Sequence, residues 1–281
     1  MSIWEALVLG VVQGLTEYLP VSSSAHLRVV PALAGWDDPG AAFTAIVQLG
    51  TLAAVFLYFR SDIRRLCAGF FRPKPWGNPD GRQALMIAAG TVPIVVIGLA
   101  LKDDIATTFR ALWVSATTLI ALALVLLLAE WYSARRTRPP RDVNSVTWTD
   151  AVVIGLVQAL ALIPGCSRSG VTITGGLFRG FTREAAARFS FLLALPSISG
   201  AGFYSLYADW DAVTRSSDQV VDLVVATLVS FVVGYLSIAF LLGFLRRYST
   251  GVFIAYRIGL GLLIFALLAT GHLKDVPTAE P

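Results

Sequence analysis

Two short polar stretches interrupt apolar runs of this chain, and their side chains are of the kinds that bind and transform phosphate groups. The first stretch holds, in order, Gln13, Glu17, Pro20, Ser22, Ser23, Ser24 and His26. The second holds Gln158, Pro164, Ser167, Arg168, Ser169, Thr172 and Thr174. Each is preceded by an apolar segment that begins with an acidic residue, Glu5 or Asp150. The two stretches therefore form an internal repeat with different charged groups.

Glu17 and Arg168 are charged residues inside apolar runs. Inserting such a side chain into a membrane costs roughly 2.5–3.5 kcal/mol on translocation scales, and these residues usually face a cavity and mark function. Gln13 precedes Glu17 by four residues, which places both on one face of a helix. The alternative interpretations are a structural hydrogen bond between helices for Glu17, and a buried counter-ion of Glu17 for Arg168.

The serine clusters follow the two prolines, where new helices are expected to begin. Serine is a preferred N-cap, and the free N–H groups of a helix N-terminus bind anions such as phosphate. Arg168 adds a planar fork that matches phosphate. The phosphate-binding candidates are Ser22, Ser24, Ser167, Ser169 and Thr172. Serines of membrane segments are otherwise caps or helix contacts.

Ser23 and His26 are three residues apart at the start of the first of these helices. This spacing suits a serine nucleophile whose proton passes to the histidine, which could also protonate a leaving phosphate. A structural histidine is the alternative. Arg257, about two turns into the last apolar segment, is predicted to snorkel toward the membrane surface, in preference to contacting substrate.

The composition indicates an integral membrane protein. Of 281 residues, 56% are hydrophobic and only 14% are charged, whereas soluble domains average about 25% charged residues. Cys67 and Cys166 lie far apart and form neither a disulfide framework nor a zinc motif. The net charge of +4 does not indicate nucleic-acid binding, because the basic residues lie in loops beside apolar segments.

The apolar segments predict an all-α polytopic fold of six transmembrane helices and two re-entrant hairpins. Residues 4–19 reach only about 24 Å as a helix, short of a bilayer core of about 30 Å. With the arm 25–34 they predict one hairpin, and residues 150–180 predict the other. Such broken helices are tolerated where protein or water surrounds them. The predicted spans are 41–59, 83–101, 111–131, 185–207, 220–245 and 251–270.

The charged loops predict the orientation. Fifteen of the 22 basic residues fall on one side if both hairpins are re-entrant, and the positive-inside rule makes that side cytoplasmic. The other side carries Asp37, Asp38, Asp103, Asp104, Asp209, Asp211 and Asp218. Both termini are then outside. Residues 1–281 form one membrane domain, in which repeats of about 1–131 and 150–270 have inverted topology and their broken tips meet near the midplane.

The run from Gln13 to His26 resembles the first motif of the undecaprenyl-diphosphate phosphatase, or bacitracin-resistance, family. The run from Pro164 to Ile173 resembles its second motif, and residues 183–194 are also similar. The resemblance implies removal of the terminal phosphate from the C55 isoprenyl diphosphate, which regenerates the lipid carrier of cell-wall synthesis. It also implies a site open to the outer face of the bacterial cytoplasmic membrane.

The same resemblance implies roles for individual residues. Ser23, His26 and Arg168 match the family's nucleophile, histidine partner and phosphate-binding arginine, and Glu17 matches its catalytic acid. A divalent cation, Mg²⁺ or Ca²⁺, is implied at Glu17 and Gln13, although this chain has glutamine where the family also has glutamate. A homodimer is a further expectation. The rival function is a transporter or flippase for the lipid carrier, because inverted repeats with broken helices are also transporter architecture.

Overall fold

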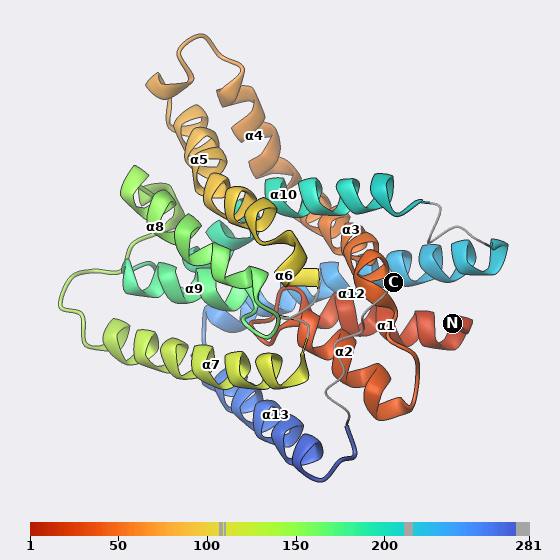
Figure 1. The fold of residues 1–281 in the computed structure, drawn as a ribbon. Helices are drawn as coiled ribbons and strands as arrows, with labels where there is room; N and C mark the ends of the chain where they lie inside the picture. The colour runs from red at the N-terminus through yellow and green to blue at the C-terminus, as the bar shows by residue number, and fades with distance from the viewer. Residues whose placement is uncertain (107–108, 110, 211–215, 274–281) are drawn as a thin grey trace.

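The computed structural model describes residues 1–106, 109, 111–210 and 216–273, and these fold into a bundle of helices joined by turns and loops (Figure 1). Six helices are long and apolar enough to cross a membrane. They are α3 (Gly40–Tyr58), α5 (Pro79–Ala100), α7 (Leu112–Ala134), α10 (Arg183–Ala208), α12 (Ser217–Leu245) and α13 (Gly251–Ala269). The six predicted spans are thus confirmed as helices, with ends within a few residues of the expected ones.

Large apolar side chains cover the outside of these helices. Val96, Leu128, Leu228 and Leu262 are each more than half exposed. A soluble protein would not expose so many large apolar side chains, because soluble monomers rarely present large contiguous apolar patches. This surface and the six long helices together define a multi-pass membrane protein.

Four short helices form the two broken arms. The first arm is α1 (Ile3–Thr16), a turn over residues 17–22, and α2 (Ser23–Ala34). The second is α8 (Trp148–Gln158), the 3₁₀ turn η4 (Ala159–Leu162) and α9 (Arg168–Phe178). The helix breaks therefore occur at Pro20 and at Pro164-Gly165, as the sequence predicted. Each break leaves backbone groups outside the helical ladder that the neighbouring segments must satisfy.

The first helix of each arm packs very closely on a long helix. In the first arm, a Cβ at Gly14 of α1 would lie 2.9 Å from the backbone nitrogen of Gly234 in α12. In the second, a Cβ at Gly155 of α8 would lie 2.3 Å from the carbonyl oxygen of Gly90 in α5. Glycine at both positions lets the backbones approach, as is common between membrane helices.

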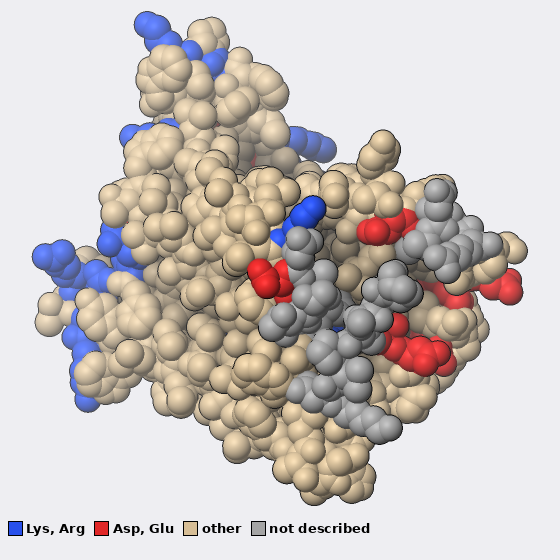
Figure 2. All heavy atoms as spheres, in the orientation of Figure 1, with Lys and Arg blue, Asp and Glu red and all other residues tan. Residues whose placement is uncertain are grey.

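The remaining helices lie at the ends of the long ones. They are α4 (Arg60–Phe70), η1 (Pro75–Gly77), α6 (Lys102–Ala106) and η3 (Val143–Ser145). On the face shown in Figure 2, Lys and Arg side chains gather toward one end and Asp and Glu toward the other. Of the acidic residues predicted to lie outside, Asp211 and the side chain of Asp103 lie outside the described part of the chain.

Asp150, the acidic residue that begins the second repeat, anchors α8 at the basic end. Its fully buried carboxylate lies 2.6 Å from Arg141 Nη2 and 2.6 Å from Arg179 Nε. Burial raises the pKa of this carboxyl, but hydrogen bonds from Arg141, Thr147 and Arg179 outweigh it and hold the pKa below its ordinary value. Asp150 thus fixes the position of the second arm and takes no part in the site below.

Candidate active site

The two breaks have the same backbone geometry. The residues that cap α2 and α9, Ser22 and Ser167, both have positive φ angles, 75° and 64°. Serine rarely adopts this conformation, which is typical of functional sites. In each break the hydroxyl of the N-cap residue approaches that of the serine two residues later, at 3.1 Å for Ser22 and Ser24 and 3.2 Å for Ser167 and Ser169. The sequence repeat is therefore also a structural repeat at this point.

The two breaks touch each other. The amide of Gly165 donates to Ser24 Oγ at 3.4 Å, and Ser169 Oγ donates to the carbonyl of Leu19 at 3.1 Å. From α7, Thr118 Oγ1 donates to the carbonyl of Pro164 at 2.6 Å. Polar groups left free by one break are thus satisfied by the other, so the tips form one unit.

Glu17 lies at the centre of this unit and is 5% exposed. Its carboxylate forms an ion pair with Arg168 of the other arm. Gln13 Nε2 donates to Oε2 at 2.9 Å, and Ser23 Oγ donates to the same oxygen at 2.8 Å. Gln48 Nε2 of α3 donates to Oε1 at 2.8 Å. A carboxylate accepts about four hydrogen bonds, and these four donors fill that capacity.

A cavity of about 220 Å³ opens beside these groups. Its lining is mostly polar and includes a few small or branched apolar side chains. The polar lining is Gln13, Glu17, Ser22, Ser23, Ser24, Thr44, Gln48, Ser167, Arg168 and Ser197. The apolar lining is Ile94, Ala161, Ile198 and Ala201. The cavity can thus hold an anionic head group while an attached apolar chain lies against α5, η4 and α10.

Three residues expected in the site lie outside this cavity. Ser169 contacts Ser167 and Leu19 of the opposite break, as described above. Thr172 Oγ1 donates to the carbonyl of Arg168 at 2.7 Å and lies 2.6 Å from Ser190 Oγ of α10. His26 makes no hydrogen bond to Ser23, whose hydroxyl donates to Glu17 instead. Ser169 and Thr172 hold the breaks in place, and only Ser22, Ser24 and Ser167 of the predicted phosphate-binding residues line the cavity.

His26 is held between the backbone of the first break and α13. Its Nδ1 lies 2.7 Å from the carbonyl of Ser22, and its Nε2 lies 2.6 Å from the hydroxyl of Tyr256. The two rings are also stacked, with centroids 5.6 Å apart. Because Ser22 is the strained cap of α2, this arrangement fixes the start of the helix that presents Ser23. Tyr256 has no motif around it, and its contact with His26 could not be predicted from the residues near it.

Arg257, the next residue of α13, is fully buried, so the prediction that it snorkels is wrong. Its guanidinium lies among backbone carbonyls, with distances of 3.1 Å to Cys166, 3.2 Å to Gly165 and 3.5 Å to Pro20. It also donates to the carbonyls of Thr118 and Leu119 in α7. The buried Arg257 guanidinium thus donates to carbonyls that both helix breaks leave outside the helical ladder. These bonds explain why the side chain does not extend to the membrane surface.

The residues expected to hold a divalent cation offer oxygen atoms only. Gln13 Oε1 is buried without a hydrogen-bond partner, and Nε2 of the same amide donates to the carboxylate of Glu17. Among the described residues, no three His, Cys, Asp or Glu side chains come together as a metal site. Mg²⁺ commonly takes one or two protein oxygens and completes its shell with water and substrate phosphates. The donor set therefore fits a hard cation that is bound together with a phosphorylated substrate.

These features define a class, the multi-pass membrane proteins whose paired broken helices enclose a polar, phosphate-compatible site. The chain belongs to the family described as bacitracin resistance protein BacA, whose model matches residues 6–263.

Its relatives match over almost their full length. An undecaprenyl-diphosphatase of Chlorobaculum parvum is 58% identical, over 97% of this chain and 99% of its own length. An undecaprenyl-diphosphatase of Prosthecochloris aestuarii is 57% identical, over 98% of this chain and 100% of its own length. The sequence motifs thus identified the family correctly.

Proposed function

We propose that this chain is an integral membrane undecaprenyl-diphosphatase, which hydrolyses undecaprenyl diphosphate to undecaprenyl phosphate and inorganic phosphate. The single observation that carries the mechanism is that Ser23 and Arg168, from opposite breaks, both bind the carboxylate of Glu17 at the wall of one cavity. A substrate in this cavity could therefore contact a potential nucleophile (Ser23), a proton acceptor (Glu17) and a phosphate-binding cation (Arg168). This interpretation agrees with the activity named for the relatives.

Arg168 is the phosphate-binding group. When the diphosphate binds, oxygens of the diphosphate replace the Glu17 carboxylate as partners of the Arg168 guanidinium. A planar guanidinium can bind two phosphate oxygens at once. The free N–H groups that begin α9, and the Ser22, Ser24 and Ser167 hydroxyls, bind the remaining oxygens. Most of the rate enhancement then comes from neutralising the negative charge of the transferring phosphoryl group.

Glu17 then becomes a proton acceptor. Released from Arg168, its carboxylate takes the proton of the Ser23 hydroxyl as Ser23 Oγ attacks the terminal phosphorus. The bond from that phosphorus to the bridging oxygen breaks, and undecaprenyl phosphate leaves. Water then cleaves the phosphoserine and releases inorganic phosphate. If Ser23 only positioned a water, no phosphoserine would form; trapping of labelled phosphate on Ser23 distinguishes the two routes.

A divalent cation would be held by Gln13 Oε1 and Glu17, together with oxygens of the substrate. When bound, it supplies positive charge that offsets the charge of the diphosphate. Chelation should therefore lower activity, and re-addition of Mg²⁺ or Ca²⁺ should restore it. Replacing Gln13 by glutamate should tighten cation binding, because a carboxylate is a stronger ligand than an amide for a hard cation.

The membrane arrangement forms part of the proposal. Each broken arm is a re-entrant hairpin, and repeats 1–131 and 150–270 are inverted, so one hairpin enters from each side. The cavity opens to the outer face of the bacterial cytoplasmic membrane, and both termini are outside. The charge distribution supports this orientation, since Lys and Arg gather at the end assigned to the cytoplasm. The expected homodimer stays a prediction, to be measured by cross-linking in native membranes.

Transport of the lipid carrier is the rival function, because paired broken helices also occur in transporters. The experiment measures phosphate release in detergent and lipid movement between leaflets in vesicles, for wild type, Glu17→Ala and Arg168→Ala. A phosphatase releases phosphate in detergent, and both variants lose that release. Inactive wild-type protein in detergent, combined with lipid movement that both variants abolish, would favour the transporter instead.

A further inference from the structure

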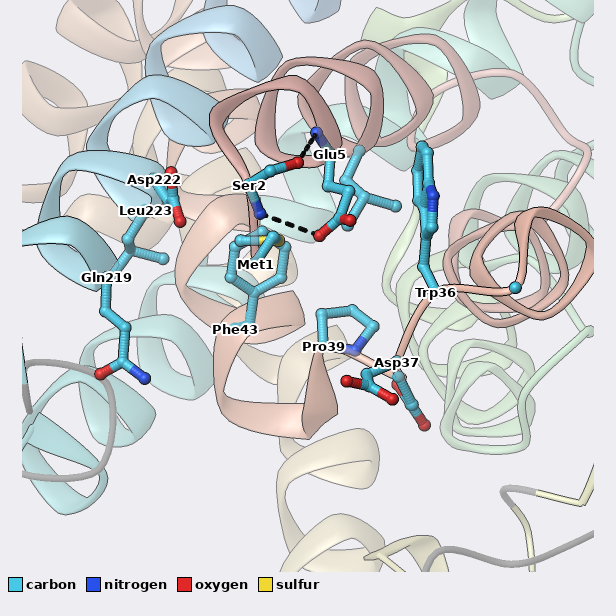
Figure 3. A pocket seen from close by; sticks show the side chains of 13 residues that line it. Met1, Ser2, Glu5, Trp36, Asp37, Pro39, Phe43, Gln219, Asp222 and Leu223 are labelled. Carbon is cyan, nitrogen blue, oxygen red and sulfur yellow. Dashed lines mark hydrogen bonds between the residues drawn. The ribbon is translucent and has the colours of Figure 1, made fainter.

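A second cavity, of about 490 Å³, lies at the opposite end of α1 from Gln13 and Glu17 (Figure 3). It is formed where the first turn of α1, the segment between α2 and α3, and the first turns of α12 converge. Its lining residues are Met1, Ser2, Glu5, Leu9, Gly35, Trp36, Asp37, Asp38, Pro39, Phe43, Gln219, Asp222 and Leu223. None of these lines the cavity between the two breaks. The function proposed above therefore leaves this cavity without a role.

The charged side chains that line this cavity are all acidic. Two of the four carboxylates already have partners. Glu5 Oε2 accepts the amide of Ser2 at 2.9 Å, and Asp38 Oδ2 lies 3.2 Å from Arg28 Nε. The lining includes no Lys, Arg or His side chain. The side chains of the lining therefore carry net negative charge, which favours a cation.

Asp222 supplies the second observation. It is only 5% exposed, yet it forms no hydrogen bond or ion pair with another residue in the described parts of the chain. Figure 3 shows it on α12, on the opposite side of the cavity from Trp36 and Asp37. Buried carboxylates are normally paired or bonded, because removing a charge from water is unfavourable. Asp222 lines the cavity and has no partner among the described residues, so a cationic ligand in the cavity would pair with it.

The shape and lining of the cavity decide which cation fits. A cavity of about 490 Å³ is far larger than a bare metal ion. The volume suits a small organic molecule. Trp36 and Phe43 offer aromatic faces, which attract ammonium groups electrostatically, and Leu9 and Leu223 offer apolar surface.

We propose that this cavity binds an organic cation that carries an ammonium group on a small apolar body. Asp222 is the counter-ion of the ammonium, and Trp36, on the opposite side of the cavity, packs on the apolar body. The same chemistry is available from an aminolipid head group and from a free amine in solution. The test therefore presents both sources to the full-length protein.

The experiment titrates ethanolamine into the purified protein by calorimetry in 150 mM salt, for wild type, Asp222→Asn, Trp36→Leu and Asp218→Asn. Asp218 is the matched control, because it is exposed, lies one turn earlier on α12 and does not line the cavity. One ethanolamine should bind per wild-type chain. Binding should weaken at least tenfold in Asp222→Asn and about threefold in Trp36→Leu, and stay unchanged in Asp218→Asn.

Thermal unfolding distinguishes an aspartate that binds the amine from one that only stabilises the fold. Without amine, Asp222→Asn should unfold at the same or a higher temperature than wild type, because an unpaired charge has been removed. Ethanolamine should raise the unfolding temperature of wild type only. A higher unfolding temperature in nanodiscs of phosphatidylethanolamine than of phosphatidylglycerol, absent in Asp222→Asn, would identify the lipid as the source. An equal temperature in both would identify the free amine.

Two results would overturn the proposal. In the first, Asp222→Asn and Trp36→Leu bind ethanolamine as wild type does, or Asp218→Asn loses as much affinity as Asp222→Asn. In the second, Asp222→Asn unfolds at a clearly lower temperature without amine, which would show that the carboxylate stabilises the fold. If Asp222→Asn cannot be purified, the Trp36→Leu titration alone tests the proposal. Weaker ethanolamine binding supports it, and binding equal to that of wild type overturns it.

Discussion

The hydrogen bond from Ser23 to Glu17 predicts that these two residues act as one catalytic unit. Glu17→Gln keeps the shape of the side chain but removes its charge and its capacity to accept the proton of Ser23. Ser23→Ala removes the hydroxyl that lies 2.8 Å from that carboxylate. If the proton passes between them, neither group works without the other, so their losses should not add.

The expected loss of kcat follows from the role of Glu17 as a general base. A positioned general base contributes about 10²- to 10⁴-fold in rate, which corresponds to about 2.7–5.4 kcal/mol of activation free energy. Each single variant should lose at least 10²-fold in kcat with undecaprenyl diphosphate. The double variant should lose about as much as the more severe single one. Independent roles would instead multiply the two losses.

The assay is inorganic phosphate release by purified protein in detergent, with kcat and KM measured for the four proteins of the cycle. Thermal unfolding of each variant serves as a control, since Glu17 also accepts hydrogen bonds from Gln13 and Gln48. Folded variants that lose less than tenfold in kcat would refute the role of the pair. So would a double variant whose loss equals the product of the single losses.

The remaining predictions concern the fold around the site. Arg257→Met should lower stability by at least about 3 kcal/mol, because it leaves several buried carbonyls without donors; an unfolding temperature equal to that of wild type would contradict this. Gly165→Ala should also destabilise the protein, because φ is +90° and the new Cβ would lie 2.1 Å from a side-chain oxygen, whereas Gly243→Ala, with nothing within 4 Å, is the neutral control. In a cysteine-free background, a cysteine replacing Arg72 should be labelled only from inside and one replacing Asp38 only from outside; the reverse pattern would overturn the orientation.

Much of this architecture could be predicted because its causes are local in sequence. A proline inside an apolar run ends a helix wherever the run lies, and length decides whether the run can span a membrane. The breaks at Pro20 and Pro164 and the six long helices followed from these two rules. The ion pair of Glu17 with Arg168 was only the alternative interpretation of Arg168 in the sequence, where phosphate binding was preferred, and the structure shows this pair.

Other parts of the site depend on packing that the sequence does not encode locally. Tyr256 bonds His26 across 230 positions of the chain, and nothing around it distinguishes it from other membrane tyrosines. Gln48 was detectable in principle, since an amide within an apolar span is unfavourable without a partner. Arg257 was misread because its distance from the end of its helix allowed snorkelling. Only the fold shows that the free carbonyls of both breaks surround it.

The repeat explains why the chemistry is divided. Ser22 and Ser167 occupy the same strained position, and each precedes the residue that begins the next helix. In the first arm that residue is Ser23, and in the second it is Arg168. We propose that this backbone conformation presents a nucleophile from one break and a phosphate-binding cation from the other. A single copy would present only one of them.

The central claim is that the two breaks together form one phosphatase site. The most direct measurement is the amount of inorganic phosphate released from undecaprenyl diphosphate by purified wild-type protein and by Arg168→Gln, with folding of both confirmed by thermal unfolding. The account predicts one phosphate per substrate molecule from wild type and at least a 10²-fold slower release from the variant, in keeping with the loss of a main transition-state donor. Folded wild-type protein that releases no phosphate, or a variant as active as wild type, would contradict it.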